Sequence, residues 1–337
     1  MTTSQRHSSA RRRVVAGAAA LAGLAWSGVR AQSAAAAPSP LGQLRIGFQK
    51  SAVNLVVLKQ QGALEKRFAG TRVQWVEFPA GPQLLEALSV GSLEFGLTGD
   101  SPPVFAQSAG RELFYVGAEP PKPLSSAVLV PTGSPLRSLR DLKGKRVALQ
   151  KGSSSHYLLV RALEKAGLAW SDITPSYLPP SDARAAFEKG AIDAWVVWDP
   201  YYAATELDIK PTVLATGVGL SSNNSFYLAS KPLVQDHPGA VQALLAELTR
   251  ADAYVQSNRK EAAQLISDFS GLSLATVHLF VSRRPPSPVA PLGASLIADQ
   301  QRVADAFLKL GLIPRPVKVA DIVWSPARAR QLDAKAA

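Results

Sequence analysis

The chain has 337 residues, with 37 Lys and Arg against 25 Asp and Glu, so its formal charge is +12. At ~150 residues per domain, this length predicts about two domains. A composition of 47% hydrophobic and 18% charged residues is that of a globular protein and excludes a chain that is disordered throughout. The absence of cysteine excludes disulfides, cysteine-ligated metals and a cysteine nucleophile.

The N-terminal segment has the three-part pattern of an export signal. Basic residues end at Arg13, an apolar run follows over 14–26, and small residues lead to a cleavage site after Ala31. The apolar run is shorter than the ~20 residues that a membrane span needs. The basic part resembles a twin-arginine export signal, although a Val-Val pair replaces the usual Phe-Leu. We therefore predict a signal peptide over 1–31 and a flexible leader over 32–41, with an uncleaved anchor as the alternative.

The positive charge is concentrated in that segment. Residues 1–31 contain five of the basic residues and no acidic one, so cleavage leaves 32 basic and 25 acidic residues, or +7. The remaining chain has no Lys/Arg run interleaved with aromatic residues, the pattern that is typical of nucleic-acid binding. We therefore expect no nucleic-acid partner.

Strand and helix patterns alternate over the first half of the mature chain. Short apolar runs predict strands over 44–48, 73–78, 93–97, 113–117 and 127–131. Apolar residues at helical spacing predict helices over 54–68 and 83–89, and a further helix begins at Ser101, where prolines fit the first turn.

A second series of the same kind begins after the Pro/Gly/Ser stretch 131–135. It predicts strands over 145–150, 176–178, 194–198 and 226–229, and helices over 157–166 and 182–189. The chain is then almost wholly helical, with the strongest patterns over 238–256, 259–269 and 293–309. The alternation predicts an α/β protein with largely parallel sheets, and the two similar series predict two lobes.

Four turns that follow predicted strands are candidate ligand positions, because ligands of open α/β sheets bind outside the carboxyl ends of the strands. The turns are 48–51, 98–102, 150–156 and 197–200.

The third turn carries the run Gly-Ser-Ser-Ser-His between a strand and a helix. Its serines, Ser153, Ser154 and Ser155, and the adjacent His156 offer donors at a helix N-terminus, which also presents free N–H groups and a partial positive charge. Capping the helix requires only one serine. The run therefore favours binding of a small oxyanion, with plain capping as the alternative.

The first two turns offer neutral donors and one carboxylate. Gln49 and Ser51 are neutral donors after the first strand. Gly99, Asp100 and Ser101 form the equivalent turn later in the same series, where Asp100 either caps the helix or holds a ligand donor.

The fourth turn combines an aromatic side chain with a carboxylate. Trp198 ends its strand and either forms an apolar wall over the ligand or packs in the core. Asp199 precedes Pro200, which fits a helix cap followed by proline in the first turn.

Catalysis has little support in the sequence. The four histidines are dispersed, and no metal-spaced cluster, paired carboxylates or nucleophile motif is present. We therefore predict no catalytic residue, no metal and no cofactor.

Six segments taken together resemble the periplasmic substrate-binding proteins of ABC importers for aliphatic sulfonates. The wider group also serves nitrate, taurine and thiamine precursors. The resemblance extends over about 42–310, and its segments are 46–50, 94–103, 142–148, 151–156, 194–201 and 224–229.

The resemblance implies a two-lobed periplasmic-binding-protein fold of type II, the "Venus flytrap", with parallel-type sheets flanked by helices and a crossing-strand hinge. Lobe 1 is expected to be discontinuous, over 42–127 and 229–337, with lobe 2 over 128–228. The residues implied to hold the sulfonate oxygens are Gln49, Gly99, Ser101, Ser154, Ser155 and His156, flanked by Trp198 and Asp199, with Asn224 near the hinge.

The function implied is capture of an organosulfonate in the periplasm by a monomer and its delivery to an ABC permease with its ATPase. Alternatives are a binding protein for taurine, nitrate or a thiamine precursor, an enzyme on the same fold, and a sensory module. Desulfinases of similar fold are understood to need a cysteine, which this chain lacks. A taurine site would need a carboxylate for the ammonium group, and the sequence leaves open whether Asp100 or Asp199 supplies one.

Overall fold

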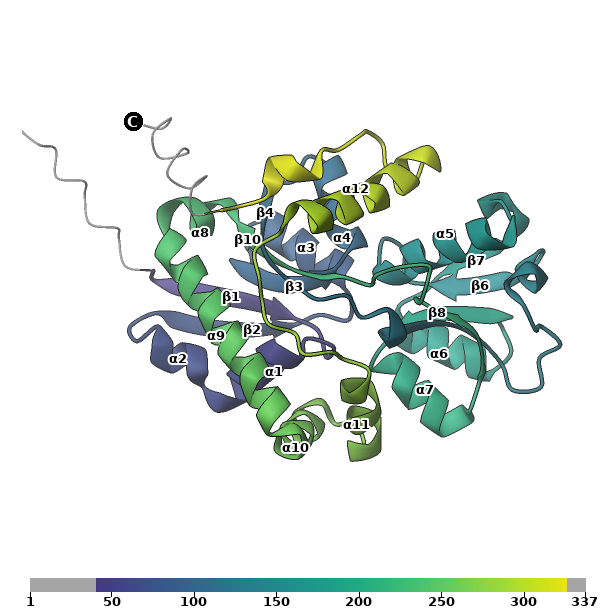
Figure 1. Cartoon of the computed structure of the whole chain (residues 1–337), viewed down its shortest axis with the longest axis horizontal. Coiled ribbons are helices and arrows are strands. Elements are labelled where there is room, and N and C mark those ends of the chain that lie inside the picture. The colour runs from purple at the N-terminus through teal and green to yellow at the C-terminus, as the bar shows by residue number, and fades with distance from the viewer. Residues whose placement is uncertain (1–40, 326–337) are drawn as a thin grey trace, which may run out of the picture. The chain divides into compact units, whose positions relative to one another are not determined.

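The computed structural model describes residues 41–325. The predicted signal peptide and all but the last residue of the predicted leader lie outside the described residues. Two five-stranded sheets, named here sheet A and sheet B, form the framework of the described part. Figure 1 shows sheet A with its helices on the left and sheet B with its helices on the right. The predicted α/β class with two sheets flanked by helices is confirmed.

Sheet A has the strand order β2-β1-β3-β10-β4. β1 runs parallel to β2 and β3, whereas β10 is antiparallel to β3 and β4. Successive side chains of a strand point to opposite faces, so Phe226 and Leu228 join the core on one face and Tyr227 and Ala229 the core on the other. The strands are β1 Gln43–Phe48, β2 Arg72–Glu77, β3 Phe95–Gly99, β4 Leu113–Glu119 and β10 Ser225–Ser230.

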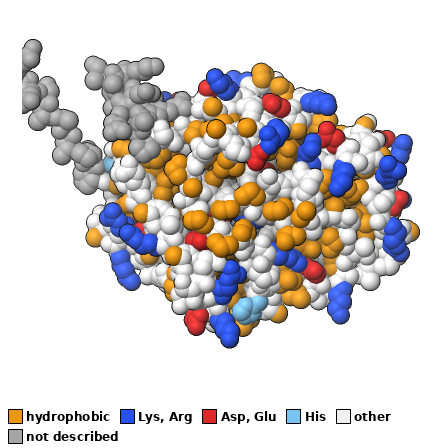
Figure 2. Space-filling view, viewed as in Figure 1, with side chains coloured by type: hydrophobic (Ala, Val, Ile, Leu, Met, Phe, Trp, Pro, Cys, Tyr) orange, Lys and Arg blue, Asp and Glu red, His pale blue; other side chains and the backbone are white. Residues whose placement is uncertain are grey.

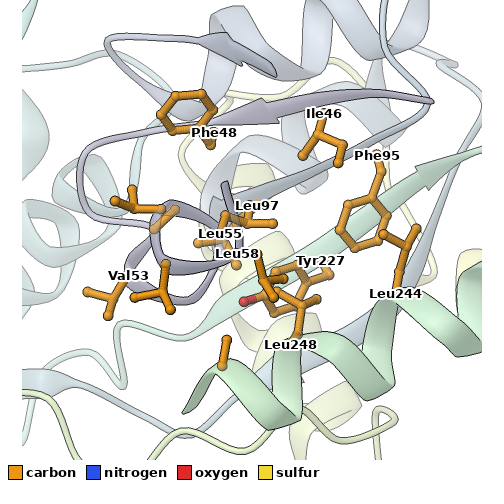
Figure 3. Packing of buried hydrophobic residues seen from close by; sticks show 14 of the residues in the cluster. Ile46, Phe48, Val53, Leu55, Leu58, Phe95, Leu97, Tyr227, Leu244 and Leu248 are labelled. Atoms are coloured by element: carbon orange, nitrogen blue, oxygen red, sulfur yellow. The ribbon is translucent and has the colours of Figure 1, made fainter. Parts of the chain in front are cut away.

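Helices cover both faces of sheet A. Figure 3 shows Leu58 of α1 and Leu244 and Leu248 of α9 around Phe95 and Tyr227 of the sheet. The helices on this face are α1 Val53–Gln61, α2 Ala63–Arg67, α8 Lys231–Asp236, α9 Pro238–Ser257, α10 Arg259–Ser270 and α11 Leu274–Ser282. The opposite face is covered by α3 Gly81–Ser89, α4 Ser101–Ser108 and α12 Ala294–Lys309.

Sheet B has the strand order β7-β6-β8-β5-β9, in which β5 is antiparallel to β8 and β9. One face packs against α5 and the other against α6 and α7. The strands are β5 Ser126–Val130, β6 Arg146–Leu149, β7 Thr174–Tyr177, β8 Ala194–Trp198 and β9 Thr212–Thr216. The helices are α5 Ser154–Ala166, α6 Pro180–Glu188 and α7 Tyr201–Ile209.

Two connecting segments join the sheets, 120–125 from β4 to β5 and 217–224 from β9 to β10. The helices after β10 contribute to the two cores of sheet A, so this half is built from two separate stretches of chain. The boundaries drawn from the sequence at 127/128 and 228/229 fall inside β5 and β10. We therefore place the division between the halves in the connecting segments.

The strands and helices predicted from the sequence are present, with shifted ends, and one predicted helix is split. The helix expected over 54–68 is the pair α1 and α2, because Gly62 adopts a left-handed conformation with φ 58° that ends α1. The sequence indicated helix at the starts of α7 and α8 but did not define their bounds. It did not predict β9, in which every residue is only half-buried.

Figure 2 shows Lys and Arg side chains dispersed among acidic and apolar ones on the face in view, without a continuous basic track. None of the helices within residues 41–325 combines the length and apolar character that crossing a membrane requires.

Candidate functional site

A cavity of about 60 Å³ lies where turns from the two sheets meet. All four candidate turns contribute to its wall, as expected for the carboxyl ends of strands in open α/β sheets. The residues from these turns are Gln49 and Ser51 after β1, Gly99 at the end of β3, Ser153 and Ser154 after β6, and Trp198 and Asp199 after β8. The connecting segments add Lys122, Ser125 and Asn223, and the first residue of β10 adds Ser225. The end of α11 and the loop after it add Phe280 and Arg284.

Gln49 is fixed at the cavity wall by a contact with the neighbouring strand. Its Nε2 donates to the carbonyl oxygen of Leu97 at 3.2 Å, and the side chain is buried. The adjacent Lys50 is directed elsewhere, because its Nζ donates to the carbonyl oxygen of Ser270. The first turn therefore offers a buried amide and the hydroxyl of Ser51, but no charge.

Gly99 and Ser154 meet across the cavity, one from each sheet. A Cβ at position 99 would lie 1.9 Å from Ser154 Oγ, so only glycine permits this approach. The Ser154 hydroxyl also hydrogen-bonds the carboxyl group of Asp100. Sequence reasoning assigned both residues to the site, and the structure brings them into direct contact.

The serine run divides into three environments. Ser153 lines the cavity, but its Oγ donates to the carbonyl oxygen of Gln150 at 2.8 Å and caps no helix N–H. Ser154 lines the cavity at the first residue of α5, where the first N–H groups have no partner within the helix. Ser155 points away from the cavity: it is fully buried, and its Oγ has no hydrogen-bond partner among the described residues.

Asp199 is a buried carboxylate of the cavity wall with an unusual pKa. Its Oδ1 accepts from the N–H of Ala203 at 3.0 Å and from Arg283 Nη1 at 3.1 Å. Asp199 was predicted to be the cap residue of the following helix, but the residue at that position of α7 is Pro200. Burial raises the pKa of Asp199 to about 7 against the attraction of Arg283. Trp198 also lines the cavity, with its ring edge-on to that of Tyr201. Its role as an apolar wall over a ligand stays a prediction.

Two buried cations line the cavity that the sequence did not single out, Lys122 and Arg284. Lys122 Nζ donates to Glu119 Oε2 at 3.1 Å and to Ser225 Oγ at 2.9 Å. Arg284 holds the same carboxylate with two parallel hydrogen bonds of 3.1 Å, and its Nη2 lies 3.8 Å from Asp252 Oδ1. Two cations and two carboxylates give this group a formal charge of zero.

The two cations decide the ionisation of Glu119. Burial by itself raises the pKa of a carboxyl group, but the attraction of Arg284 and Lys122 outweighs it and lowers the pKa of Glu119 to about 2. Tyr227 OH adds a hydrogen bond of 2.8 Å to the same carboxylate. Glu119 therefore stays ionised and holds both cations beside the cavity.

His156 does not line the cavity. Its ring is fully buried, with ring centroids of Trp170 at 4.9 Å, Phe307 at 5.1 Å and Phe105 at 6.1 Å. Its Nδ1 accepts from the N–H of Gly152, and burial lowers the pKa of His156 to about 3, so the ring is neutral. The turn over 150–156 ends at His156, and this end faces the protein interior. His156 is therefore a core residue at the contact between α5 of sheet B and the helices of sheet A.

Three further candidate residues, Asp100, Ser101 and Asn224, are not among the residues that line this cavity. Asp100 and Asn224 line a second cavity of about 480 Å³. Ser101 is fully buried, with its Oγ bonded to Asp100 Oδ1 at 2.9 Å, and burial raises the pKa of Asp100 to about 6. At the hinge, Asn223 lines the first cavity instead of Asn224, since Asn223 takes the left-handed conformation with φ 48° that asparagine tolerates.

Little in the sequence indicates that Lys122 and Arg284 line a cavity. Lys122 follows two prolines between β4 and β5, and Arg284 precedes two prolines after α11, so both lie in segments that sequence reasoning treated as breaks between elements. Lysine and arginine are almost never fully buried unless paired. Their pairing with Glu119 depends on residues up to 165 positions away, which no local pattern contains.

The arrangement suits a small oxyanion. A cavity of about 60 Å³ has room for one compact group of a few atoms. Neutral hydroxyl and amide donors, a helix N-terminus and two buried cations surround it. Among residues 41–325, no group of three or more His, Asp or Glu side chains is placed to hold a metal ion.

Comparisons with known proteins agree with this geometry. The NMT1/THI5-like family profile matches residues 68–262. An Escherichia coli K12 protein named for the binding of aliphatic sulfonates is 46% identical over 309 residues, which are 92% of this chain and 96% of the relative.

Two crystal structures are similar to the chain over almost their whole length. The alkanesulfonate-binding protein SsuA of Xanthomonas axonopodis pv. citri, bound to MOPS, is 49% identical with a TM-score of 0.82, covering 84% of this chain and 98% of that one. The periplasmic aliphatic sulphonate-binding protein SsuA of Escherichia coli is 47% identical with a TM-score of 0.79, covering 85% and 92%. The fold, the cavity and these likenesses lead to one conclusion: the chain belongs to the NMT1/THI5-like family.

Proposed function

We propose that the protein is an extracytoplasmic solute-binding protein that captures an aliphatic sulfonate between its two halves and delivers it to an ABC permease. The observation that carries the proposal is the convergence of four strand-to-helix turns and two buried cations on one cavity of about 60 Å³. The similarity to two SsuA proteins, one of them bound to a sulfonate buffer, supports the same ligand class.

The cavity chemistry fits a sulfonate head group. A sulfonate stays singly ionised at physiological pH, so it needs donors for three oxygens and no titrating partner. Ser51, Ser154 and the amide of Gln49 offer neutral donors, while Lys122 and Arg284 offer charge-assisted ones. Closing the two halves over the ligand excludes water, and donors left unpaired in a dry site would be costly, which favours a ligand with several acceptors.

Binding without catalysis is part of the proposal, and so is location outside the cytoplasm. The relatives compared above are binding proteins, and the chain has no cysteine to act as a nucleophile. The export pattern over residues 1–31 supports delivery to the periplasm, where a partner permease with its ATPase would take up the ligand from a monomeric carrier.

Tryptophan fluorescence provides the test, because Trp198 lies in the cavity wall. We expect saturable changes with ethanesulfonate, propane-1-sulfonate and MOPS, with a Kd at or below the micromolar range, and much weaker responses to sulfate and nitrate. Trp198→Phe separates the cavity signal from that of the other tryptophans, and calorimetry then gives the affinity of both proteins. The absence of binding to every sulfonate would refute the proposed function, and tight binding of nitrate or taurine alone would replace the ligand.

A further inference from the structure

One carboxylate in the cavity wall is at odds with an anionic ligand. Asp199 lines the cavity and its side chain is 5% exposed. An ionised carboxylate there repels an oxyanion, whereas it would attract a ligand that also carries an ammonium group. How Asp199 is neutralised therefore bears on which sulfonates the site accepts.

Arg283 approaches Asp199 from the opposite half of the molecule. It follows α11, which packs on the helices of sheet A, whereas Asp199 follows β8 of sheet B. The guanidinium donates to Asp199 Oδ1 through Nη1 at 3.1 Å and to Glu206 through Nη2. It also lies 3.9 Å from the ring centroid of Tyr202.

The three partners of Arg283 lie on one face of the β8–α7 segment. Positions 199, 202 and 206 are spaced three and four apart, the spacing that aligns side chains along a helix. Arg283 is itself only 12% exposed, so the contact is shielded from solvent and from salt. The contact therefore joins the two halves next to the cavity.

The charged groups around Asp199 are Arg283 and Glu206, and Lys122 and Arg284 line the same cavity. Tyr202 is the nearest other titratable group. One guanidinium faces two carboxyl groups, and burial raises the pKa of Asp199 to about 7. At and below neutral pH, the group of three therefore has a net charge close to zero.

We propose that Arg283 is a specificity-determining residue: by pairing with Asp199 across the two halves, it fits the cavity for sulfonates without an ammonium group and disfavours amino-sulfonates such as taurine. The inference rests on the proposed function and names the ligand class within it. The ammonium group of a ligand near Asp199 would also lie close to the positively charged guanidinium of Arg283. It would lose its hydration without gaining a carboxylate that is free to pair with it.

Two ligands isolate the effect, since taurine and propane-1-sulfonate differ in the replacement of a terminal methyl group by an ammonium group. Calorimetric titration at pH 8 gives the ratio of the two dissociation constants for each variant. We expect the wild-type protein to prefer propane-1-sulfonate. In Arg283→Gln the ratio shifts at least tenfold toward taurine, because the ammonium group takes the place of the guanidinium that lowers the pKa of Asp199 and pairs with the ionised carboxylate.

Rescue variants separate this role from a loss of structure. Arg283→Lys retains the charge and is expected to keep most of the wild-type preference. Asp199→Asn in the Arg283→Gln background removes the released carboxylate and abolishes the shift. The matched control is Arg184→Gln: Arg184 also bridges two carboxylates, Glu188 and Asp208, but within the sheet B half. Its loss leaves the ratio unchanged.

The outcomes distinguish a failure of this inference from a failure of the proposed function. A wild-type protein that binds neither ligand refutes both the proposed function and this inference. Two outcomes refute the inference alone when the wild-type protein binds propane-1-sulfonate. In the first, the ratio of the dissociation constants is the same in Arg283→Gln as in the wild-type protein. In the second, the ratio shifts but the shift persists when Asp199→Asn removes the carboxylate. Thermal unfolding of each variant identifies a folding failure, in which case Arg283→Lys and the single Asp199→Asn decide the question.

Discussion

Replacing Gly99 by Ala tests whether the contact between the two turns positions a ligand donor. The added Cβ would lie 1.9 Å from Ser154 Oγ and 3.2 Å from Ser154 Cβ, against the ~3.5 Å at which carbon atoms pack without repulsion. No positive φ is present at Gly99, so the backbone itself accepts alanine. The strain must therefore be relieved by rotating the Ser154 hydroxyl out of its place.

The size of the effect follows from what Ser154 loses. A hydrogen bond to a charged group is worth about 1.5–3 kcal/mol, so we expect the affinity for propane-1-sulfonate to fall about 10- to 150-fold. Overpacking in the same place lowers the free energy of unfolding by about 1–3 kcal/mol. Adding Ser154→Ala removes the clashing oxygen, so stability recovers while affinity does not.

Calorimetric titration and urea unfolding of the single and double variants provide the two measurements. Gly239→Ala is the matched control, since a Cβ there has no neighbour within 4 Å and its site in the first turn of α9 is remote from the cavity. An unchanged affinity in Gly99→Ala would refute the assignment of Ser154 as a ligand donor. A recovery of affinity in the double variant would contradict it equally.

Three further predictions concern the serine run, the buried histidine and the buried ion pairs. Ser154→Ala should weaken sulfonate binding by about 1.5–3 kcal/mol, whereas Ser155→Ala should leave it within twofold, because only the first hydroxyl lines the cavity; calorimetry that gives equal losses would contradict the structure. Since burial lowers the pKa of His156 to about 3 from 6.5 in the unfolded chain, the stability it contributes is present above pH 6.5 and is lost as the pH falls toward 3. Between pH 7 and pH 5 the wild-type protein should therefore lose about 2 kcal/mol more than His156→Gln in urea unfolding, and parallel curves would show that the ring is not buried neutral. Glu119→Gln leaves Lys122 without a carboxylate and Arg284 with Asp252 alone, at 3.8 Å, and should cost about 3–5 kcal/mol in the free energy of unfolding; a loss below about 1 kcal/mol would mean that water reaches this group.

The strands and turns could be read from the sequence because their signals are local. An apolar run such as 194–198 predicts a strand without knowledge of its partners, and a polar turn after it predicts a position at the carboxyl edge of a sheet. This rule selected Gln49, Ser154 and Trp198, which the structure places around one cavity. The resemblance implied Asn224 near the hinge, whereas the adjacent Asn223 lines the cavity, because the sequence does not resolve which of two neighbouring residues faces it.

The charges of the cavity could not be read in this way. Lys122, Arg283 and Arg284 resemble ordinary surface residues. Arg283 and Arg284 pair with carboxylates 84 and 165 positions away in the chain. Lys122 pairs with Glu119, three positions before it, but no local pattern shows that this pair is buried at a cavity. His156 shows the reverse error: a histidine beside three serines suggests a ligand, yet aromatic rings from the other half enclose it.

The formal charge of +12 also shows the difference between what the sequence determines and what only the tertiary structure determines. The distribution of charge along the chain is a property of the sequence, and five of the positive charges belong to the predicted export segment. The alternating strand and helix patterns of the remaining chain specify two α/β sheets and the turns at their edges. Only the tertiary structure decided which cations leave the surface, because the cost of burying a charge is offset by a partner that folding alone brings within reach. The sequence by itself thus determined where a ligand could bind, and the packing of the two halves determined the electrostatic field that it would meet.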